Sequence, residues 1–290
     1  MGNWLEKAKF AFRLFYESLL AIWTLLLMPG KRFRGPLPGA DEELGDLMES
    51  LRSDVRMLAE DIGPRNVAHA PEKLAISEAF ITAEFQKAGF TVERQPYEVF
   101  GVSCANLEVE IPGTEDSSEI VIVGAHYDSV PDCPAANDNA SGVAATLSLA
   151  RTFARARSAR TLRFVAFVNE EAPYAHTHLM GSCVYAAGCR QRGENIRAML
   201  SLETIGYYDR GGGTQSYPAP LGLLYPSTAD FIAFVGNLDS RALLERVTGL
   251  FRHHSEFPAY GDALPGVITG VGWSDQWSFW QEGFPAVMVT

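Results

Sequence analysis

Three short apolar segments of this chain each end in acidic or imidazole side chains, and this repeated pattern constrains the fold more than any other feature. The segments and the residues that follow them are Ile120–Ala125 with His126, Leu162–Val168 with Glu170 and Glu171, and Met199–Leu202 with Glu203. Short apolar runs between helical patterns are typical of buried parallel strands. Because catalytic groups gather beyond the carboxyl ends of such strands, we expect these side chains to meet at one edge of an α/β sheet. One imidazole among several carboxylates suggests a metal site.

Size and charge limit the class of protein. The chain has 290 residues, of which 47% are hydrophobic and 20% charged, and this composition is typical of a globular protein with one large domain or two small ones. It carries 24 Lys and Arg residues against 35 Asp and Glu residues. Because nucleic-acid binding needs clustered basic residues, this acidic balance argues against a nucleic-acid partner.

The N-terminal segment differs from the rest of the chain. Residues 18–28 are uncharged, whereas the longer stretch 10–28 contains Arg13 and Glu17. A spanning helix needs about 20 apolar residues, so this stretch is at the lower limit. We favour a membrane anchor or an uncleaved signal, and therefore a membrane-anchored or exported protein over a cytoplasmic one. An interfacial amphipathic helix and a helix docked on its own domain are the alternatives.

Composition also divides the chain into regions. Gly30–Gly39 holds three Gly and two Pro, which is typical of a linker, so we assign residues 1–40 to the N-terminal segment and 41–290 to the folded domain. Apolar spacing predicts helices over 41–62, 74–88 and 140–154, the last capped by Asn139, and strands over 91–100 and 105–111. The Gly- and Pro-rich residues 207–226 are interpreted as a loop that covers the site, although a plain surface loop fits equally well.

The cysteines do not form a recognisable metal motif. Cys104, Cys133, Cys183 and Cys189 include no C-x-x-C pair, which argues against a cysteine zinc site. We favour four free or buried thiols, with a disulfide between Cys183 and Cys189 as the alternative in an exported protein.

Two further polar groups accompany the first apolar run. A metal-binding His usually donates its second ring N–H to a carboxylate, and Asp128 could serve His126 in this way. Taken alone, this pair fits a structural histidine better. In the loop Asn137–Gly142, the carboxylate of Asp138 could bridge two cations, but a helix-capping loop explains the same residues equally well.

The adjacent pair Glu170 and Glu171 is the most informative. Two acids at the end of a seven-residue apolar run are costly unless something neutralises them, and a cation would do so. Neighbouring residues of an extended chain point in opposite directions, so one Glu can bind metal while the other acts as a base. Glu203 alone fits an exposed acid, but with the other groups it completes a set suited to Zn²⁺, Mn²⁺ or Co²⁺.

Four of the other five histidines are less informative. His176 and His178 follow Glu171 in a loop and could contact a substrate. His253 and His254 lie on a predicted helix, where we favour a surface role.

Five motifs in order along the chain resemble the di-zinc aminopeptidases, the metallopeptidases that include bacterial leucyl aminopeptidase and glutamate carboxypeptidase II. The motifs are His126-x-Asp128, Asn137–Gly142, Asn169-Glu170-Glu171, Met180–Ser182 and Ser201–Gly206. The resemblance covers roughly residues 51–290. It implies a three-layer α/β/α sandwich with a central mixed, mostly parallel sheet, and two Zn²⁺ ions, which Mn²⁺ or Co²⁺ could replace.

The resemblance also implies a role for each site residue. Asp138 would bridge both ions, His126 and Glu203 would complete one site, Glu171 would bind the other ion, Glu170 would be the general base, and Asp128 would support His126. A cis peptide is implied at Asp138–Asn139. The implied substrate is a peptide with a free N-terminus, cleaved by a metal-bridging hydroxide whose proton Glu170 transfers to the leaving amine.

One part of the family pattern is missing. The last ligand of the second zinc is a His after the next strand, which corresponds here to Ala286–Val289, and the chain ends at Thr290. We therefore interpret the chain as C-terminally incomplete, with one ligand of the second site lacking and its activity as given in doubt. The alternatives are an inactive binding module on the same fold, and a one-zinc acyltransferase of glutaminyl-cyclase type.

Overall fold

The structure is a computed structural model that describes residues 6–13, 15, 16, 19, 23, 28, 33, 35–37, 39, 41–217, 221–223 and 225–290. The chain forms two compact units. The larger unit comprises Gly39–Tyr207 and Ser274–Pro285, and the smaller unit contains Tyr208–Trp273, Ala286–Thr290 and the described residues of 1–38. The single domain predicted over residues 41–290 stays a prediction.

The larger unit is built on a mixed sheet in the order β1-β2-β4-β3-β5. Its strands are β1 (Glu93–Val99), β2 (Val102–Ile111), β3 (Asp116–His126), β4 (Arg160–Phe167) and β5 (Asn195–Leu202). Central strand β3 pairs in parallel with both β4 and β5, whereas β2 pairs antiparallel with β1 and β4. The predicted mixed sheet is confirmed, and its parallel part consists of the three strands that precede the polar residues.

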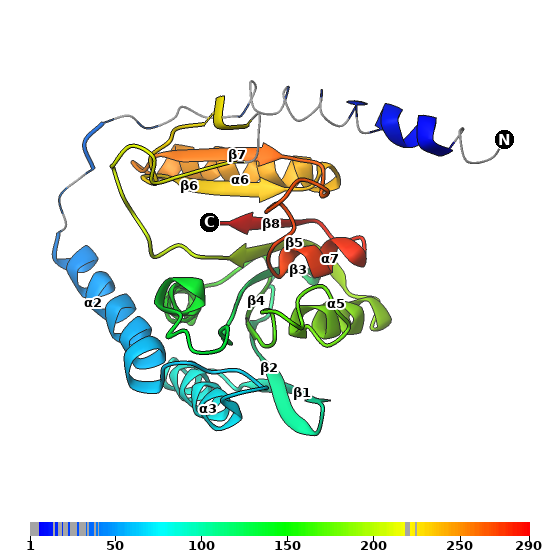
Figure 1. Cartoon of the computed structure of the whole chain (residues 1–290). Coiled ribbons are helices and arrows are strands. Elements are labelled where there is room, and N and C mark those ends of the chain that lie inside the picture. The colour runs from blue at the N-terminus through cyan, green and yellow to red at the C-terminus, as the bar shows by residue number, and fades with distance from the viewer. Residues whose placement is uncertain are drawn as a thin grey trace. The chain divides into compact units, whose positions relative to one another are not determined.

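Helices cover both faces of this sheet (Figure 1). On one face lie α2 (Glu42–Arg56), α3 (Pro71–Lys87) and α4 (Gly142–Phe153), and on the other lie α5 (Gly181–Gln191) and α7 (Gln276–Gln281). Helix α4 packs on β3, β4 and β5, while α5 contacts β2 and α7. The predicted three-layer α/β/α arrangement is therefore confirmed for this unit.

Local side-chain chemistry explains where the helices begin. Asp41 caps α2 by accepting a hydrogen bond from the Leu44 amide at 2.9 Å. The predicted helix over 41–62 continues past α2 as a π-helical turn, η1 (Met57–Ile62), and ends at Gly63, whose φ of 80° suits glycine. Pro71 occupies the first turn of α3, where its missing N–H costs nothing.

The helix predicted from residue 140 begins two residues later. Residues Ala136–Ser141 form a π-helical turn, η2, and α4 starts at Gly142. Ser141, and not the predicted Asn139, is the N-cap residue of α4, and its side chain makes no capping hydrogen bond. Oδ1 of Asn139 accepts a hydrogen bond from the Gly142 amide at 3.0 Å. The peptide bond between Asp138 and Asn139 is cis, as the family resemblance implied.

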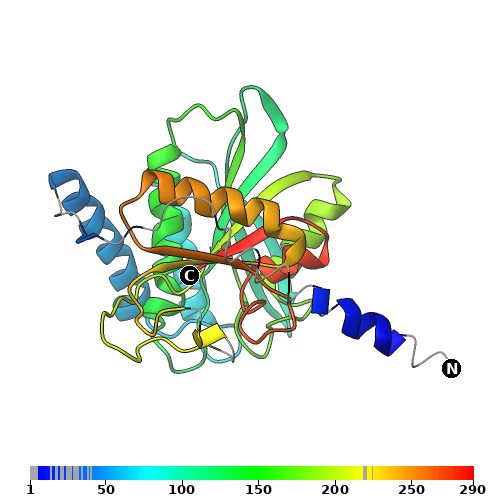
Figure 2. The same cartoon turned by 90° about the horizontal axis from the view of Figure 1, so that it is seen from above.

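From Tyr208 onward, the described residues of the smaller unit form three strands and one long helix. They are β6 (Ile232–Gly236), β7 (Ala259–Ala263), β8 (Ala286–Val289) and α6 (Arg241–His254). Strand β6 pairs in parallel with β7 and antiparallel with β8, and α6 packs on one face of them (Figure 2). The described residues of the loop 207–226 include one short 3₁₀ turn, η3 (Leu221–Leu223), and a second, η4 (Leu238–Ser240), precedes α6. That the loop covers the site stays a prediction.

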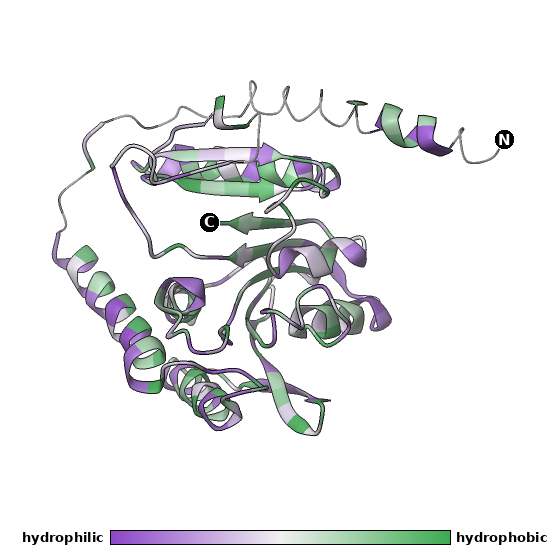
Figure 3. Ribbon diagram, viewed as in Figure 1, coloured by the Kyte–Doolittle hydropathy of each residue, from purple (hydrophilic) through white to green (hydrophobic). Residues whose placement is uncertain are grey.

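Apolar side chains fill the core, although Leu44 and Leu47 of α2 are apolar and exposed. Strands β6 and β8 are almost uniformly apolar, whereas α2 presents both apolar and polar sides (Figure 3). In the larger unit the core includes Ile122 of β3, Leu147 of α4 and Phe279 of α7, none of which is more than 1% exposed. Burial of these side chains is the main force that holds the helices on the sheet.

All four cysteines are free thiols, which agrees with the favoured interpretation. Among the described residues, no helix is long and apolar enough to cross a bilayer. Much of the segment 10–28 lies outside the described residues, so its predicted membrane association stays a prediction.

Candidate metal centre

The three parallel strands deliver the predicted polar residues to one edge of the sheet. His126 is the last residue of β3, Glu170 and Glu171 follow β4, and Glu203 follows β5 directly. Because β3 lies between β4 and β5 and all three run in the same direction, their carboxyl ends are neighbours. Asp138 reaches the same place from the turn before α4.

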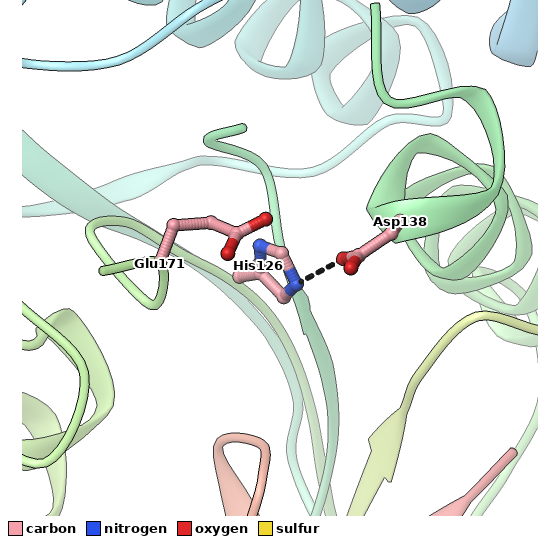
Figure 4. Close-up of side chains that lie close together, drawn as sticks. All are labelled: His126, Asp138 and Glu171. Carbon is pink, nitrogen blue, oxygen red and sulfur yellow. Dashed lines mark ion pairs between the residues drawn. The ribbon is translucent and has the colours of Figure 1, made fainter. Parts of the chain in front are cut away.

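The imidazole of His126 lies at the centre of this group and is fully buried. Its Nε2 atom lies 3.1 Å from Oδ1 of Asp138, 3.4 Å from Oε2 of Glu203 and 3.9 Å from Oε2 of Glu170. Glu171 approaches from another side: His126, Asp138 and Glu171 each offer a ligand atom within 4.8 Å of the others (Figure 4). All four predicted metal ligands and Glu170 therefore belong to one cluster.

Asp128 supports the acidic pair more closely than it supports the imidazole. Its Oδ1 lies 3.5 Å from Nδ1 of His126, which is long for a hydrogen bond. The two carboxylate oxygens instead accept hydrogen bonds from the backbone amides of Glu170 at 3.1 Å and Glu171 at 3.2 Å. Because Asp128 is 1% exposed, these contacts hold the backbone of the pair in place.

Two residues orient Glu203. The Nδ2 group of Asn139 donates to the Leu202 carbonyl at 2.8 Å and to Oε2 of Glu203 at 3.3 Å. The Ser274 hydroxyl donates to the same Glu203 oxygen at 2.7 Å. The backbone of Gly142 approaches Asn139 and Leu202 so closely that a Cβ at this position would collide with both.

Sequence reasoning missed Ser274 and the residue beside it. Asp275 is fully buried, and neither carboxylate oxygen makes a hydrogen bond of ordinary geometry with a described residue. Burial raises the pKa of Asp275 to about 7, although His126 opposes the shift. The available signal was local: Asp275 and two serines interrupt a segment, residues 273–281, that is otherwise rich in Trp and Phe.

The electrostatics of the cluster show an excess of negative charge. Burial raises the pKa of Glu170 well above its usual range and that of Glu171 to about 7. Burial alone would lower the pKa of His126, but Glu203 and the other carboxylates raise it well above its ordinary value. Glu170 and Glu171 therefore hold a proton more readily than ordinary carboxyl groups, and a bound divalent ion would oppose these shifts.

The donor set fits such an ion. Neither ring nitrogen of His126 has a hydrogen-bond partner of acceptable geometry among the described residues, although buried polar atoms normally do. One imidazole nitrogen and several carboxylate oxygens, without thiolate, suit Zn²⁺. The side chain of Asp138 is 52% exposed, so the cluster is open to solvent on that side.

The other histidines lie outside this cluster or on the surface. His176 is exposed and stacks on Trp277 with ring centroids 4.3 Å apart. His178 is also exposed, and contact of either residue with a substrate stays a prediction. His253 and His254 are exposed at the end of α6, which confirms the predicted surface location.

An α/β sheet with a histidine and carboxylates at its carboxyl edge fits the class of zinc metallopeptidases. The model of the family described as Peptidase family M28 matches residues 106–290, and the chain belongs to this family. The chain is 34% identical over 251 residues to a protein of Escherichia coli (strain K12) named "Uncharacterized protein YfbL". The aligned region covers 83% of this chain and 76% of that relative. The chain is 28% identical over 224 residues to a "Probable zinc metalloprotease" of Pyrenophora teres f. teres, but spans 46% of that relative's length.

Solved structures share the fold at low sequence identity. An aminopeptidase from Aneurinibacillus sp. strain AM-1 has a TM-score of 0.59 and 16% identity, with 83% of this chain and 84% of that chain covered. A glutaminyl cyclase from an Acidobacteriales bacterium has a TM-score of 0.61 and 18% identity, with 89% and 82% covered. These likenesses show a fold that is common to aminopeptidases and glutaminyl cyclases.

Proposed function

We propose that this protein is a zinc-dependent aminopeptidase that hydrolyses the N-terminal bond of peptides. The observation that carries the proposal is the placement of Glu170. Its carboxylate lies 3.9 Å from the imidazole Nε2 that faces Asp138 and Glu203, and it is followed directly by Glu171. A general base beside a set of metal ligands is the arrangement that metal-assisted hydrolysis needs.

The family pattern divides the ligands between two ions. His126, Glu203 and Asp138 would hold one, and Asp138 and Glu171 would hold the other. When bound, the ions would lower the pKa of a water molecule and polarise the scissile carbonyl. The distances between His126 and its neighbours support the first set most directly.

Glu170 would move the proton. It would accept a proton from the attacking water and donate it to the nitrogen of the leaving amine. A carboxylate shuttles protons best when its pKa approaches the working pH, and burial raises the pKa of Glu170 in that direction. The hydrogen bond from its amide to Asp128 would keep the side chain directed at the reacting atoms.

The acidic surroundings support a substrate with a free amino group. Asp275 and Glu170 are buried close enough to His126 to interact with its charge, and burial raises the pKa of both; a protonated α-amino group would stabilise their ionised forms. Blocking the amino group would remove this attraction, so a peptide with a free N-terminus is the proposed substrate.

The test is metal content together with a peptide assay on the purified protein. Zinc should co-purify with the protein, and mass spectrometry should show loss of the first residue from an unblocked peptide but not from its N-acetylated form. A chelator should stop the reaction and added Zn²⁺ should restore it. A metal-free protein that leaves both peptides intact would point to a binding module instead.

The same assay separates the alternative that the glutaminyl cyclase fold likeness raises. A peptide that begins with Gln should be shortened by an aminopeptidase. Loss of ammonia without shortening would show cyclisation and would contradict the proposal.

A further inference from the structure

One buried guanidinium connects the backbone segments that carry the metal ligands. Arg65 lies between η1 and α3 and is fully buried. Its Nε donates to the carbonyl of Tyr127 at 2.7 Å, and its Nη2 donates to the carbonyl of Ala135 at 3.2 Å. Its Nη1 donates to the carbonyl of Pro134 at 2.9 Å.

These acceptors lie next to the ligands in the chain. Tyr127 stands between His126 and Asp128, and Ala135 precedes the turn that carries Asp138. The backbone of Arg65 strengthens the first contact, because its N–H donates to the Ser129 hydroxyl at 3.0 Å and its carbonyl accepts from the Ser129 amide at 2.9 Å. Arg65 therefore links the segment that contains His126 to the turn that contains Asp138.

The guanidinium also donates hydrogen bonds to the helical layer. Nη1 also donates to the carbonyls of Leu58 and Gly63, each at 3.1 Å. Both acceptors belong to the region of η1, which continues α2 and packs against η2. Arg65 therefore connects the segments that carry His126 and Asp138 to the helical layer as well as to each other.

Arg65 is unusual for a buried charged residue because its partners are uncharged. Among the described residues, no carboxylate oxygen lies within 4.0 Å of the guanidinium, and all five acceptors are backbone carbonyls. Burial lowers the pKa of Arg65 to about 10, while the more distant carboxylates of Asp128 and Asp138 oppose the shift. A buried charge without a close partner is costly, so a specific geometric role explains its presence better than stability does.

We propose that Arg65 is a positioning residue for the metal centre, which sets the separation between His126 and Asp138 through its bonds to Tyr127 and Ala135. This inference rests on the proposed metal centre and adds a residue outside the family motifs quoted above. A lysine could keep the charge but not the forked set of hydrogen bonds, because its ammonium is a point donor on a flexible stem.

The test compares Arg65→Lys with Arg163→Lys. Arg163 is also a largely buried arginine of the larger unit, but it donates to Glu194 at 2.9 and 3.1 Å and lies in β4, before the acidic pair. Each protein is loaded with Co²⁺, and the visible absorption spectrum and the dissociation constant for Co²⁺ are measured beside the far-UV circular dichroism. We expect Arg65→Lys to weaken Co²⁺ binding by about 10–100-fold and to change the spectrum, as loss of a ligand-supporting group does. Arg163→Lys should change neither.

A folded Arg65→Lys protein with the original affinity and spectrum would overturn the inference. If that variant does not fold, Ser129→Ala provides the test, because it loosens the same segment without changing a charge. It should alter the Co²⁺ spectrum in the same direction, and an unaltered spectrum would overturn the inference as well. Failure of the unmodified protein to bind Co²⁺ would overturn the metal centre itself, and with it this role, so the two failures are distinguishable.

Discussion

Nε2 of His126 lies 3.1 Å from Oδ1 of Asp138, although the imidazole is fully buried and the aspartate side chain is half exposed. The contact therefore spans the boundary between the protein core and the solvent. The buried imidazole comes from the end of β3, and the partly exposed carboxylate comes from the turn before α4.

Replacement of the proposed base tests the mechanism. Glu170→Gln should reduce kcat by at least about 10²-fold, because general acid–base catalysis typically contributes 10²–10⁴-fold. Bound zinc should remain, since the other carboxylates are unchanged. Peptide hydrolysis and metal analysis on the same sample measure both. Glu98→Gln, at an exposed position of β1, is the control and should alter neither. Retention of most of the activity by Glu170→Gln would assign the base to another residue.

Two substitutions distinguish the proposed metal ligand Glu203 from Ser274, which orients it. Glu203→Gln removes a proposed ligand, whereas Ser274→Ala removes only the hydroxyl that donates to it at 2.7 Å. We expect Ser274→Ala to weaken zinc binding by about 10–100-fold and Glu203→Gln to weaken it further. Competition with a chromophoric chelator measures both constants. Equal affinity of the Glu203→Gln and unmodified proteins would exclude Glu203 as a ligand.

The buried carboxyl of Asp262 should make stability depend on pH. It is 4% exposed, and burial raises its pKa from 3.8 to about 6, although the Tyr225 hydroxyl donates to it at 2.8 Å. The folded state then binds more protons than the unfolded state between these values. Its stabilising contribution is complete below pH 3.8 and is lost as pH rises through about 6, by at most roughly 3 kcal/mol.

Asp262→Asn isolates this effect from other titrating groups. The amide keeps an oxygen for the Tyr225 hydroxyl but cannot ionise. Denaturant unfolding at several pH values should show the variant gaining stability relative to the unmodified protein as pH rises from 4 to 7. A difference in free energy of unfolding that does not change with pH would show that Asp262 has an ordinary pKa in the folded protein.

The core beneath the site should respond strongly to truncation of Phe279. This side chain of α7 is fully buried, and its ring centroid lies 6.1 Å from those of Phe167 and Tyr185. Phe279→Ala should destabilise the protein by about 3–5 kcal/mol, because it removes buried surface and leaves a cavity. The matched control is Phe100→Ala, at a side chain that is 86% exposed. Similar unfolding midpoints for the two variants would contradict the packing described for α7.

Much of the candidate site could be predicted because its residues follow strands whose apolar pattern is local. His126, Glu170 and Glu203 each come within three residues of a strand end, and parallel pairing brings those ends together. Helix boundaries were harder to predict. The helix expected from residue 140 begins at Gly142, because the chain first makes the turn that directs Asp138 toward the imidazole.

The sequence by itself determined the three strands that carry the site, the kinds of side chain at their carboxyl ends and, through five ordered motifs, the family. The tertiary structure alone decided which groups surround those side chains. Arg65 and Ser274 lie far from the ligands in the chain, and their roles arise only when helices and loops pack against the sheet edge. Periodicity records which face of an element is buried, whereas hydrogen bonds between distant segments depend on how those elements meet.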